Sequence, residues 1–254
     1  MHPNVHHTTR LTLVLLIGCA ATQLFGAEKP GRQASSNVVA HAEADLTAAR
    51  KRSAAEATNS AAAWELGRAC FVRGELPASP AAQEKLYAEG VTAGRHSVAL
   101  DPKCGPAHYY LGMNIGRVAD LKRNLAAFGM VKEVEKEFER ARELDEKFCS
   151  AGPDRNLGLL YLHAPGWPIS VGSQKLARKH FERAVKLAPD FPENRLNLAE
   201  AYLQWREKKL LQQELEALQQ LWTRAKTNLT GVAWEEDWAD WESRRAQLPK
   251  PAAK

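Results

Sequence analysis

One segment in the C-terminal half restricts the fold most strongly. From Ala177 to Pro189 the residues follow the pattern A-x3-F-x2-A-x4-P. In a helix this spacing places Ala177, Phe181 and Ala184 on one face, because residues three and four positions apart are neighbours. Small residues let a second helix approach closely, and the proline ends the first. The spacing therefore predicts one helix of a tightly packed antiparallel pair.

The other helix of this pair is expected upstream, at Leu157-Gly158-x2-Tyr161. Together the two segments match a tetratricopeptide repeat, a helix pair that stacks on its neighbours into a solenoid. Similar first helices occur at Leu66-Gly67-x2-Cys70, Leu111-Gly112-x2-Ile115 and Leu198-Ala199-x2-Tyr202. Their expected second helices carry Gly90, Gly94 and Ser97, then Val134, Phe138 and Ala141, then Leu211, Leu215 and Leu218. The sequence predicts an all-α, tetratricopeptide-like helical solenoid of about four imperfect repeats.

The repeats are longer than the usual length of about 34 residues. Pro102 and Pro189 each close a second helix, and they lie 87 residues apart, 19 more than two such repeats would need. The alignment assigns ten extra residues to 115–134, two to the neighbourhood of Cys149 and seven to 161–177. Insertions in solenoids fall in loops on one edge, often the binding edge. We therefore expect long loops within 115–134 and 161–177.

Helices are also expected at both ends of the repeat array. One runs from about His41 to Ala55, and a C-terminal helix runs from about Ala233 to Gln247. The second carries Trp234, Trp238 and Trp241 in one stripe, which must be covered. A capping role for this helix is the favoured interpretation. The alternative is a contact with a partner or a membrane surface, which the neighbouring acids disfavour for an anionic membrane.

The N-terminus has the features of an export signal. The apolar run 11–18 is too short to span a bilayer, which takes about 20 residues, but it has the length of a signal-peptide core. It ends in Leu16-Ile17-Gly18-Cys19, a bacterial lipoprotein pattern that makes Cys19 the lipid anchor. Cleavage near Ala27 is the alternative. The predicted boundaries are a signal peptide at 1–18, a tether at 19–37, the helical domain at 38–248 and a polar tail at 249–254.

Composition excludes several classes of protein. With 44% hydrophobic and 26% charged residues the chain is globular. Its net charge of +5 is small and its basic residues alternate with acids, which argues against nucleic-acid binding. Four cysteines cannot form a dense disulfide scaffold. Without Cys19 three remain, Cys70, Cys104 and Cys149, and we expect them to be small buried residues.

Motifs of catalysis, nucleotide binding and metal binding are absent from the sequence. Neither G-x-G-x-x-G, G-x4-G-K-[ST], H-E-x-x-H nor C-x-x-C occurs. We therefore expect no enzyme activity, no metal and no cofactor. The scattered histidines are expected to be ordinary packing or surface residues: His96, His108, His163 and His180.

Trp167 is the clearest candidate for a contact with a ligand or partner. It lies in the inserted segment 162–173, where Pro165 and Pro168 stiffen the backbone. A large aromatic ring on a stiff loop is a contact of low entropic cost. The alternative is a plug that packs over the interface between repeats.

Five further residues are candidates for binding. Asn114 and Arg117 share a helix face and could present donors to an anionic group, the alternative being a solvated helix end with Arg117 paired to Asp120. Asp154 is expected as an ordinary charge at a helix N-terminus, with Arg155 beside it. Two tyrosines are expected on the concave side with Trp167. The predicted binding residues are thus Trp167, Tyr109, Tyr110, Asn114, Arg117 and Arg155.

Three segments together carry a resemblance to a known family: 108–117, 131–141 and 160–168. They resemble the T component of TRAP-transporter-associated periplasmic proteins, the TatT-like lipoproteins, over about residues 61–202. The chain is similar, more loosely, to the tetratricopeptide-like regulators of microtubule dynamics. The first resemblance implies a periplasmic lipoprotein that partners a TRAP-type solute-binding protein and holds a small hydrophobic ligand. A scaffold for envelope assembly that binds peptide segments is the alternative, and association with a second copy stays open.

Overall fold

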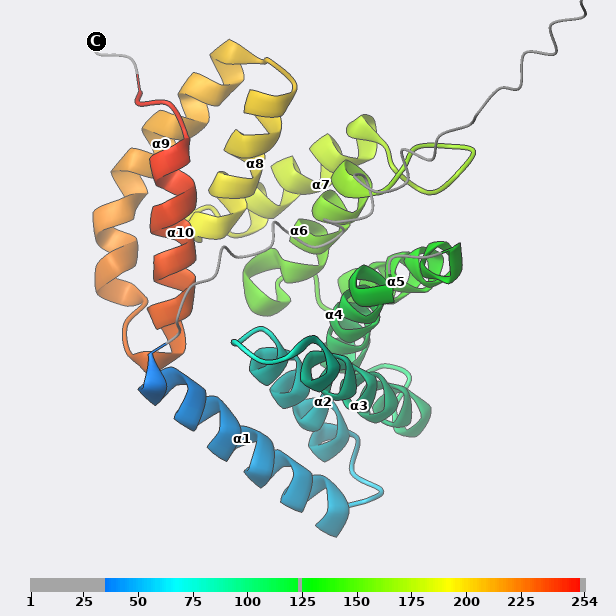
Figure 1. The fold of residues 1–254 in the computed structure, drawn as a ribbon. Coiled ribbons are helices and arrows are strands. Elements are labelled where there is room, and N and C mark those ends of the chain that lie inside the picture. Colours follow the sequence, from blue (N-terminus) through cyan, green and yellow to red (C-terminus); the bar gives the residue numbers. More distant parts are fainter. Residues whose placement is uncertain (1–34, 123–124, 252–254) are drawn as a thin grey trace, which may run out of the picture.

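The computed structural model describes residues 35–122 and 125–251. Within these residues the regular structure is helical, apart from one isolated bridge between Gly166 and Gly172. This confirms the predicted all-α class (Figure 1). The helices are α1 (Ser36–Ala55), α2 (Ser60–Gly74), α3 (Pro80–Leu100), α4 (Gly105–Lys122), α5 (Leu125–Leu144), α6 (Phe148–His163), α7 (Gln174–Leu187), α8 (Pro192–Gln204), α9 (Lys208–Asn228), the 3-10 helix η2 (Val232–Trp234) and α10 (Glu235–Gln247).

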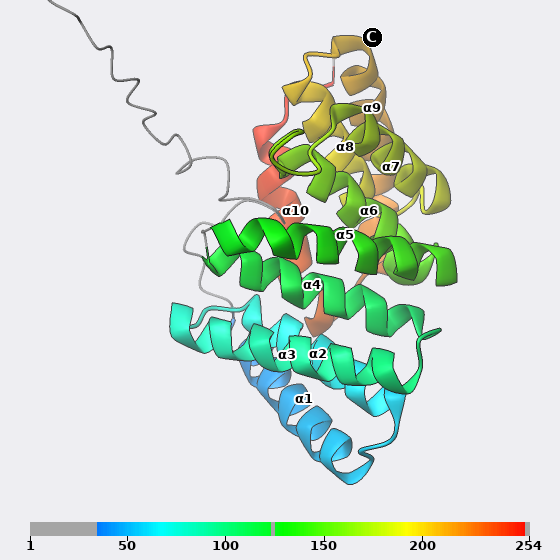
Figure 2. The same cartoon turned by 90° about the vertical axis from the view of Figure 1, so that its right-hand side faces the viewer.

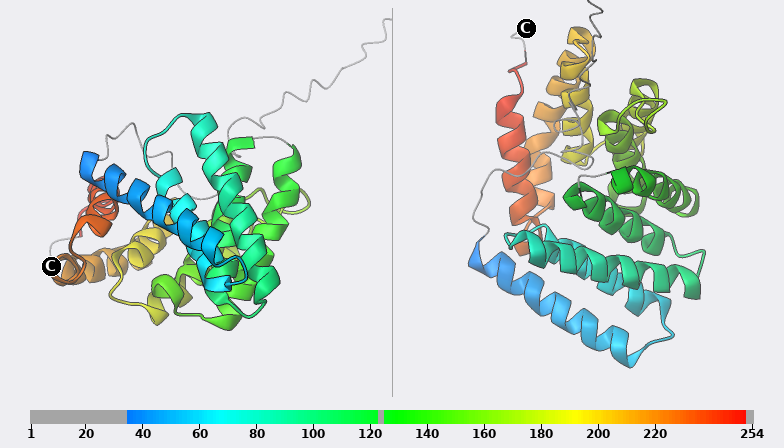
Figure 3. Two further views of the ribbon diagram at one scale, coloured as in Figure 1. Left: turned by 90° about the horizontal axis from the view of Figure 1, so that it is seen from below. Right: turned by 45° about the vertical axis from the view of Figure 1, so that its right-hand side comes forward.

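The helices pack as antiparallel pairs that stack into a solenoid. The pairs are α2 with α3, α4 with α5, α6 with α7 and α8 with α9, and the first helices of neighbouring pairs also touch. The pairs follow one another in chain order along the stack (Figure 3). Turns within the pairs α2–α3 and α6–α7 lie on one edge, and the turns α3–α4 and α7–α8 lie on the opposite edge (Figure 2). We call these the inner-turn edge and the outer-turn edge.

Glycines in the first helices allow the close approach that the repeat pattern predicts. A Cβ added at Gly158 would lie 2.5 Å from Cδ1 of Phe181, and one at Gly112 would lie 2.9 Å from Cε1 of Phe138. Both phenylalanines are completely buried. Each ring therefore fills the space that the missing side chain leaves, and the pairing of α4 with α5 and of α6 with α7 depends on it.

The expectation of a long loop within 115–134 is wrong. Helix α4 continues to Lys122 and α5 begins at Leu125, so the extra residues lengthen both helices. The physical reason is that the apolar face continues through the inserted segment, where Val118, Ala127 and Val131 are buried. A helix that still has a face to bury gains more by extending than by ending in a loop. The second insertion, after α6, does form a loop.

The extra residues near Cys149 form a kink at the start of α6. Cys149, Ser150 and Ala151 have φ values of 48°, 56° and 62°, a left-handed conformation that costs roughly 1–2 kcal/mol per non-glycine residue. Arg155 offsets this cost by donating from Nη1 to the carbonyls of Cys149 and Ser150 at 3.2 and 3.1 Å. Nδ2 of Asn194 donates to the carbonyl of Ser150 at 3.0 Å.

The cysteines differ in exposure, which corrects the expectation that all three are buried. Cys70 is buried, and burial raises the pKa of its thiol to about 12. Cys104 is half-buried, and Cys149 is exposed because the left-handed turn lies at the surface. Only Cys70 thus packs as the small hydrophobic residue that the sequence suggested.

The N-terminal helix begins earlier than predicted. α1 starts at Ser36, inside the expected tether 19–37, because Oγ of Ser35 accepts a hydrogen bond from the backbone N–H of Val38 at 3.3 Å. The signal peptide at 1–18 and the anchor at Cys19 lie outside the described residues, as does the end of the polar tail. Among the residues that the structure describes, no helix is long and apolar enough to cross a membrane.

The tryptophan stripe of the C-terminal helix packs against the solenoid, with Trp241 buried and Trp234 and Trp238 half-buried, which agrees with the capping interpretation. Trp241 is 1% exposed, and its ring lies 5.4 Å from that of Phe191 and 5.0 Å from that of Trp238. Nε1 of Trp238 donates to the carbonyl of Leu229 at 2.6 Å. α10 therefore seals the last helix pair.

The two ends of the helical array meet. Oγ of Ser35 donates to Oε2 of Glu235 at 3.1 Å, and Val38, Val39 and Val232 pack together beside this bond. Figure 1 shows the start of α1 next to the lower end of α10. The solenoid thus curves far enough for α1 to contact η2 and the start of α10.

Candidate binding site

The insertion after α6 forms a closed loop on the inner-turn edge, from Ala164 to Ser173. Two hydrogen bonds hold its base: the N–H of Gly172 donates to the carbonyl of Pro165 at 2.9 Å, and that of Ser173 donates to the carbonyl of Tyr161 at 2.8 Å. Ser173 also caps α7. We call this segment the Trp167 loop.

Gly172 is required by the geometry of this base. A Cβ at Gly172 would lie 2.0 Å from the carbonyl oxygen of Ala164, a backbone atom that cannot move aside. The tip is also hydrogen-bonded, since the N–H groups of Ile169 and Ser170 donate to the carbonyl of Gly166 at 3.1 and 3.3 Å. The peptide bond between Trp167 and Pro168 is cis. The hydrogen bonds fix the loop at its base and at its tip.

The tip presents two large apolar side chains to solvent. Trp167 is 89% exposed and Ile169 is 65% exposed, the highest values among the exposed large hydrophobic residues that the structure describes. A plug over the repeat interface would be buried. The exposure of the indole thus agrees with a contact role and disagrees with the plug.

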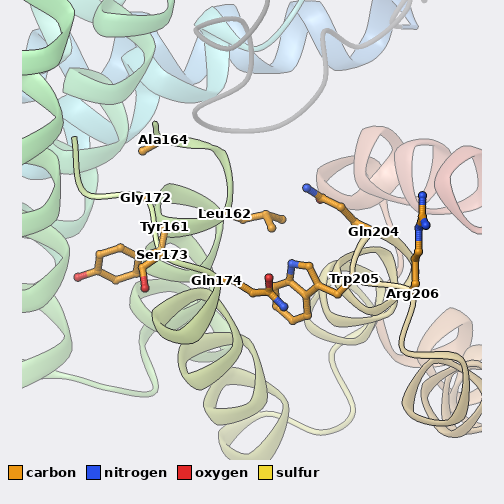
Figure 4. A pocket seen from close by; sticks show the side chains of 9 residues that line it. All are labelled: Tyr161, Leu162, Ala164, Gly172, Ser173, Gln174, Gln204, Trp205 and Arg206. Carbon is orange, nitrogen blue, oxygen red and sulfur yellow. The ribbon is translucent and has the colours of Figure 1, made fainter. Parts of the chain in front are cut away.

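A pocket of about 500 Å³ lies beside the base of the Trp167 loop and opens to solvent. Its walls are the end of α6, the start of α7 and the turn between α8 and α9 (Figure 4). Leu162 and Trp205 supply large apolar side chains to the lining of the pocket. Polar side chains come from Gln174, Gln204 and Arg206. We call this the Trp205 pocket.

Trp205 is held in place by neighbours outside the pocket. Its ring packs against that of Tyr202, with the centroids 6.0 Å apart, and the guanidinium of Arg178 lies 4.9 Å from it. Arg178 also forms an ion pair with Glu207. The aromatic wall is therefore preorganised.

Two of the predicted binding residues are inaccessible. Tyr109 is 4% exposed, and its hydroxyl accepts a hydrogen bond from Nδ2 of Asn156 at 2.9 Å. Asn114 is fully buried, and its Nδ2 donates to the carbonyls of Gly67 and Tyr110 at 3.0 and 2.8 Å. Both residues lie where first helices stack on one another, so they serve packing and cannot meet a ligand from solvent.

The other three predicted residues are engaged within the solenoid. Arg117 pairs with Glu75 and, at 3.4 Å, with Asp120, which agrees with the paired alternative. Arg155 is 6% exposed and lies 3.2 Å from Glu193. The half-buried ring of Tyr110 stacks on Trp64 at 6.0 Å, with an angle of 3° between the planes. None of the five lines the Trp205 pocket.

Two of the four histidines singled out from the sequence, His108 and His180, take buried packing positions, whereas His96 is exposed. Nδ1 of His108 lies 2.5 Å from Oε2 of Glu137, and Nδ1 of His180 lies 2.8 Å from Oδ1 of Asp154. Asp154 is fully buried and also accepts from Arg183, so it is a structural acceptor and more than the ordinary charge at a helix N-terminus that the sequence predicts. In the described part of the chain no group of three side chains could hold a metal ion.

Sequence reasoning missed Trp205 and Arg206. The only local signal is a tryptophan directly after a predicted first helix, in the polar turn W-R-E-K-K. Nothing in the sequence places this turn beside the Trp167 loop, because that proximity depends on how the third and fourth pairs stack.

Comparison with known proteins gives one family match. The model of the family "Regulator of microtubule dynamics protein 1-3" matches residues 34–151. Comparison with curated proteins gives no match. The matched segment spans α1 to the kink of α6 and stops before the Trp167 loop and the Trp205 pocket. Over its N-terminal helices, the chain is similar to the regulators of microtubule dynamics.

Proposed function

We propose that the protein is a binding scaffold that docks a partner protein through the Trp167 loop and the Trp205 pocket. The observation that carries this proposal is the 89% exposure of Trp167 on a loop fixed by hydrogen bonds at base and tip. An exposed indole without a partner is unfavourable in water, since burying its apolar surface would contribute about 25 cal/mol per Å². Partner binding is the function that makes use of this surface.

The geometry favours docking over carriage of a small ligand. A carrier needs a cavity that encloses most of its ligand, whereas the Trp205 pocket opens to solvent. An exposed knob beside an open pocket suits a protein surface, which can cover the knob and fill the pocket together. The same geometry serves the alternative function, an envelope scaffold that binds peptide segments of its partners.

The finer proposal is a TatT-like accessory of a TRAP-type transport system. It places the protein on the periplasmic side of a bacterial membrane, anchored through a lipid on Cys19, with a solute-binding protein as its partner. Support comes from the pattern Leu16-Ile17-Gly18-Cys19 and from the resemblance over residues 61–202. A catalytic role is not proposed.

Site-specific photocrosslinking tests the docking proposal. A benzophenone amino acid placed at Trp167, in cells of the source organism, should yield one discrete crosslinked protein. The control position is Leu100, a 39% exposed residue on the outer-turn edge, which should yield none. The identified protein, once purified, should bind the wild-type chain about 30-fold more tightly than Trp167→Ala, equivalent to about 2 kcal/mol. Equal crosslinking at both positions, or equal affinity of both chains, would reject the proposal.

Fatty-acid labelling tests the anchor separately. The wild-type chain should incorporate labelled fatty acid and sediment with membranes, whereas Cys19→Ser should do neither. A soluble, unlabelled wild-type protein whose mature end lies near Ala27 would show that the lipoprotein pattern has been misread.

A further inference from the structure

Two helices begin beside the Trp205 pocket, and both carry lysines in their first turn. α7 starts at Gln174 and α9 at Lys208, and neither has an acid in its first turn. These turns carry Lys175, Lys208 and Lys209 instead. The N-terminus of a helix bears a partial positive charge and favours acids, so lysines here are unfavourable for the isolated chain. The rim therefore adds side-chain cations to a backbone field of the same sign.

These cations form no ion pair within the part of the chain that the structure describes. Lys175, Arg206, Lys208 and Lys209 are exposed, and no described residue forms an ion pair with any of them. Glu207 stands between two of them in the sequence, but it is bound by Arg178. Among the described residues that line the pocket, Arg206 is the one that carries a charge.

The pocket offers uncharged donors next to an apolar wall. Gln174 lines it from the start of α7 and Gln204 from the end of α8, and neither amide is hydrogen-bonded to another described side chain. Leu162 and Trp205 line the same pocket, and the Gln174 side chain is drawn next to the indole of Trp205 (Figure 4). Free amide and guanidinium donors suit carboxylates, and the wall suits one apolar side chain.

We propose that the Trp205 pocket binds an acidic segment of the partner protein. One apolar side chain of that segment packs against Leu162 and Trp205, and carboxylates on either side of it meet Arg206 and Lys175. This inference rests on the proposed docking function and names the chemistry of the partner. An anionic bilayer would also be attracted by the lysines, but a concave pocket of about 500 Å³ receives a side chain and not a flat surface.

Binding of synthetic peptides tests this chemistry with the full chain. Three 12-residue peptides share a central phenylalanine, flanked by glutamate and aspartate, by glutamine and asparagine, or by lysine. Fluorescence anisotropy should show that the acidic peptide binds at least tenfold more tightly than the neutral one and that the lysine peptide does not bind. The affinity for the acidic peptide should fall at least tenfold when sodium chloride is raised from about 0.05 M to about 0.5 M, because salt screens exposed charges.

Charge reversal identifies the residues. The double variant Arg206→Glu, Lys175→Glu should weaken binding of the acidic peptide at least tenfold and leave the melting temperature unchanged. The matched control is Lys103→Glu, an exposed lysine on the outer-turn edge, which should bind like wild type. Equal affinity for acidic and neutral peptides, or an unaffected double variant, overturns the proposal.

Vesicles test the competing occupant. Vesicles of phosphatidylcholine with about 30% phosphatidylglycerol should neither sediment the Cys19→Ser chain nor displace the acidic peptide. Sedimentation that requires Arg206 would make a lipid surface the occupant and the peptide proposal wrong. Crosslinking at Trp167 that persists while every peptide fails would keep the docking function and reject the acidic class. If acidic peptides bind but Trp167 yields no crosslinked partner, the acidic chemistry of the pocket is kept and the docking function is rejected.

Discussion

Arg117 of α4 binds Glu75, the residue that directly follows α2, through two parallel hydrogen bonds. Nε lies 2.7 Å from Oε1, and Nη2 lies 2.6 Å from Oε2. The two side chains are 20% and 19% exposed. Because a planar guanidinium and a planar carboxylate match in this arrangement, the pair fixes the orientation of both groups. It therefore connects the first repeat to the second at the inner-turn edge.

Arg117→Met should lower the free energy of unfolding by about 2–3 kcal/mol, because it removes two charge-assisted hydrogen bonds to the largely buried carboxylate of Glu75. The double variant Arg117→Met, Glu75→Gln should recover part of this loss, since the carboxylate that forms the two short hydrogen bonds with Arg117 is then neutral. Urea denaturation of the four chains measures the coupling. If adding Glu75→Gln to the Arg117→Met chain costs as much stability as adding it to the wild-type chain, the two residues are not coupled. Crosslinking at Trp167 should be unchanged in the folded Arg117→Met chain.

Two tryptophans of opposite exposure should respond oppositely to truncation. Trp241→Ala removes a ring that is 1% exposed, and should destabilise the chain by about 3–5 kcal/mol. Trp167→Ala removes a ring that is 89% exposed, and should change stability by about 0.5 kcal/mol or less. Thermal and urea unfolding measure both. A large loss for Trp167→Ala would mean that the indole packs on the solenoid in solution.

Two helix glycines provide a similar pair. Gly158→Ala would put a Cβ within 2.5 Å of the buried ring of Phe181, and should cost about 1–3 kcal/mol. At Gly129 in α5 an added Cβ meets nothing within 4 Å, so Gly129→Ala should stabilise the chain by up to about 1 kcal/mol. Differential scanning calorimetry should therefore give shifts of the melting temperature with opposite signs. Shifts of the same sign would contradict the predicted contact between Gly158 and Phe181.

The pair of His108 and Glu137 predicts a pH dependence. Burial lowers the pKa of His108, but the bonds to Glu137 and to the carbonyl of Pro102 raise it more, so the pKa lies above its ordinary value. A raised pKa stabilises the fold below the unfolded value of about 6.5, and this contribution is lost as the pH rises through the folded value. Glu137→Gln should therefore cost more stability at about pH 6 than at about pH 8.5.

Urea titrations at the two pH values measure this difference. Glu133→Gln is the control, because Glu133 pairs with Arg95 at the surface and has no histidine partner. Its effect should be small and the same at both pH values. An equal cost of Glu137→Gln at both pH values would show that the charge of His108 does not contribute to folding.

The helix pairs could be predicted because the signal that specifies them is local. Gly158 and Tyr161 in one helix, and Ala177, Phe181 and Ala184 in the next, are spaced by helix turns, so the sequence alone shows the faces that meet. Whether an insertion forms a loop or lengthens the adjacent helices is not specified by local signals. Ten extra residues fit equally well into a loop or into two longer helices, and the choice depends on whether a neighbouring helix is present to bury their apolar face.

The polar candidates show the limit for sites. Asn114, Arg117 and Arg155 were chosen because polar groups on a helix face can meet a ligand, and the structure buries or pairs all three. The partners of the two arginines are Glu75, 42 residues before Arg117, and Glu193 in α8. No periodicity connects such residues. Trp167 was predicted to be a contact candidate because the prolines and glycines around it prevent a helix, which is again local information.

The hydrogen bond between Ser35 and Glu235 gives the solenoid a direct contact between its two ends. In an ordinary open solenoid the terminal repeats fray independently, because each repeat contacts only its neighbours. Here the start of α1 contacts η2 and the first residue of α10. The contact consists of one exposed hydrogen bond, between Ser35 and Glu235, and of packing among Val38, Val39 and Val232. This contact is weak compared with the helix pairs, so we expect it to open before any pair separates. While it is closed, α1 and α10 cannot move apart, so the two ends of the array are coupled directly as well as through the stack between them.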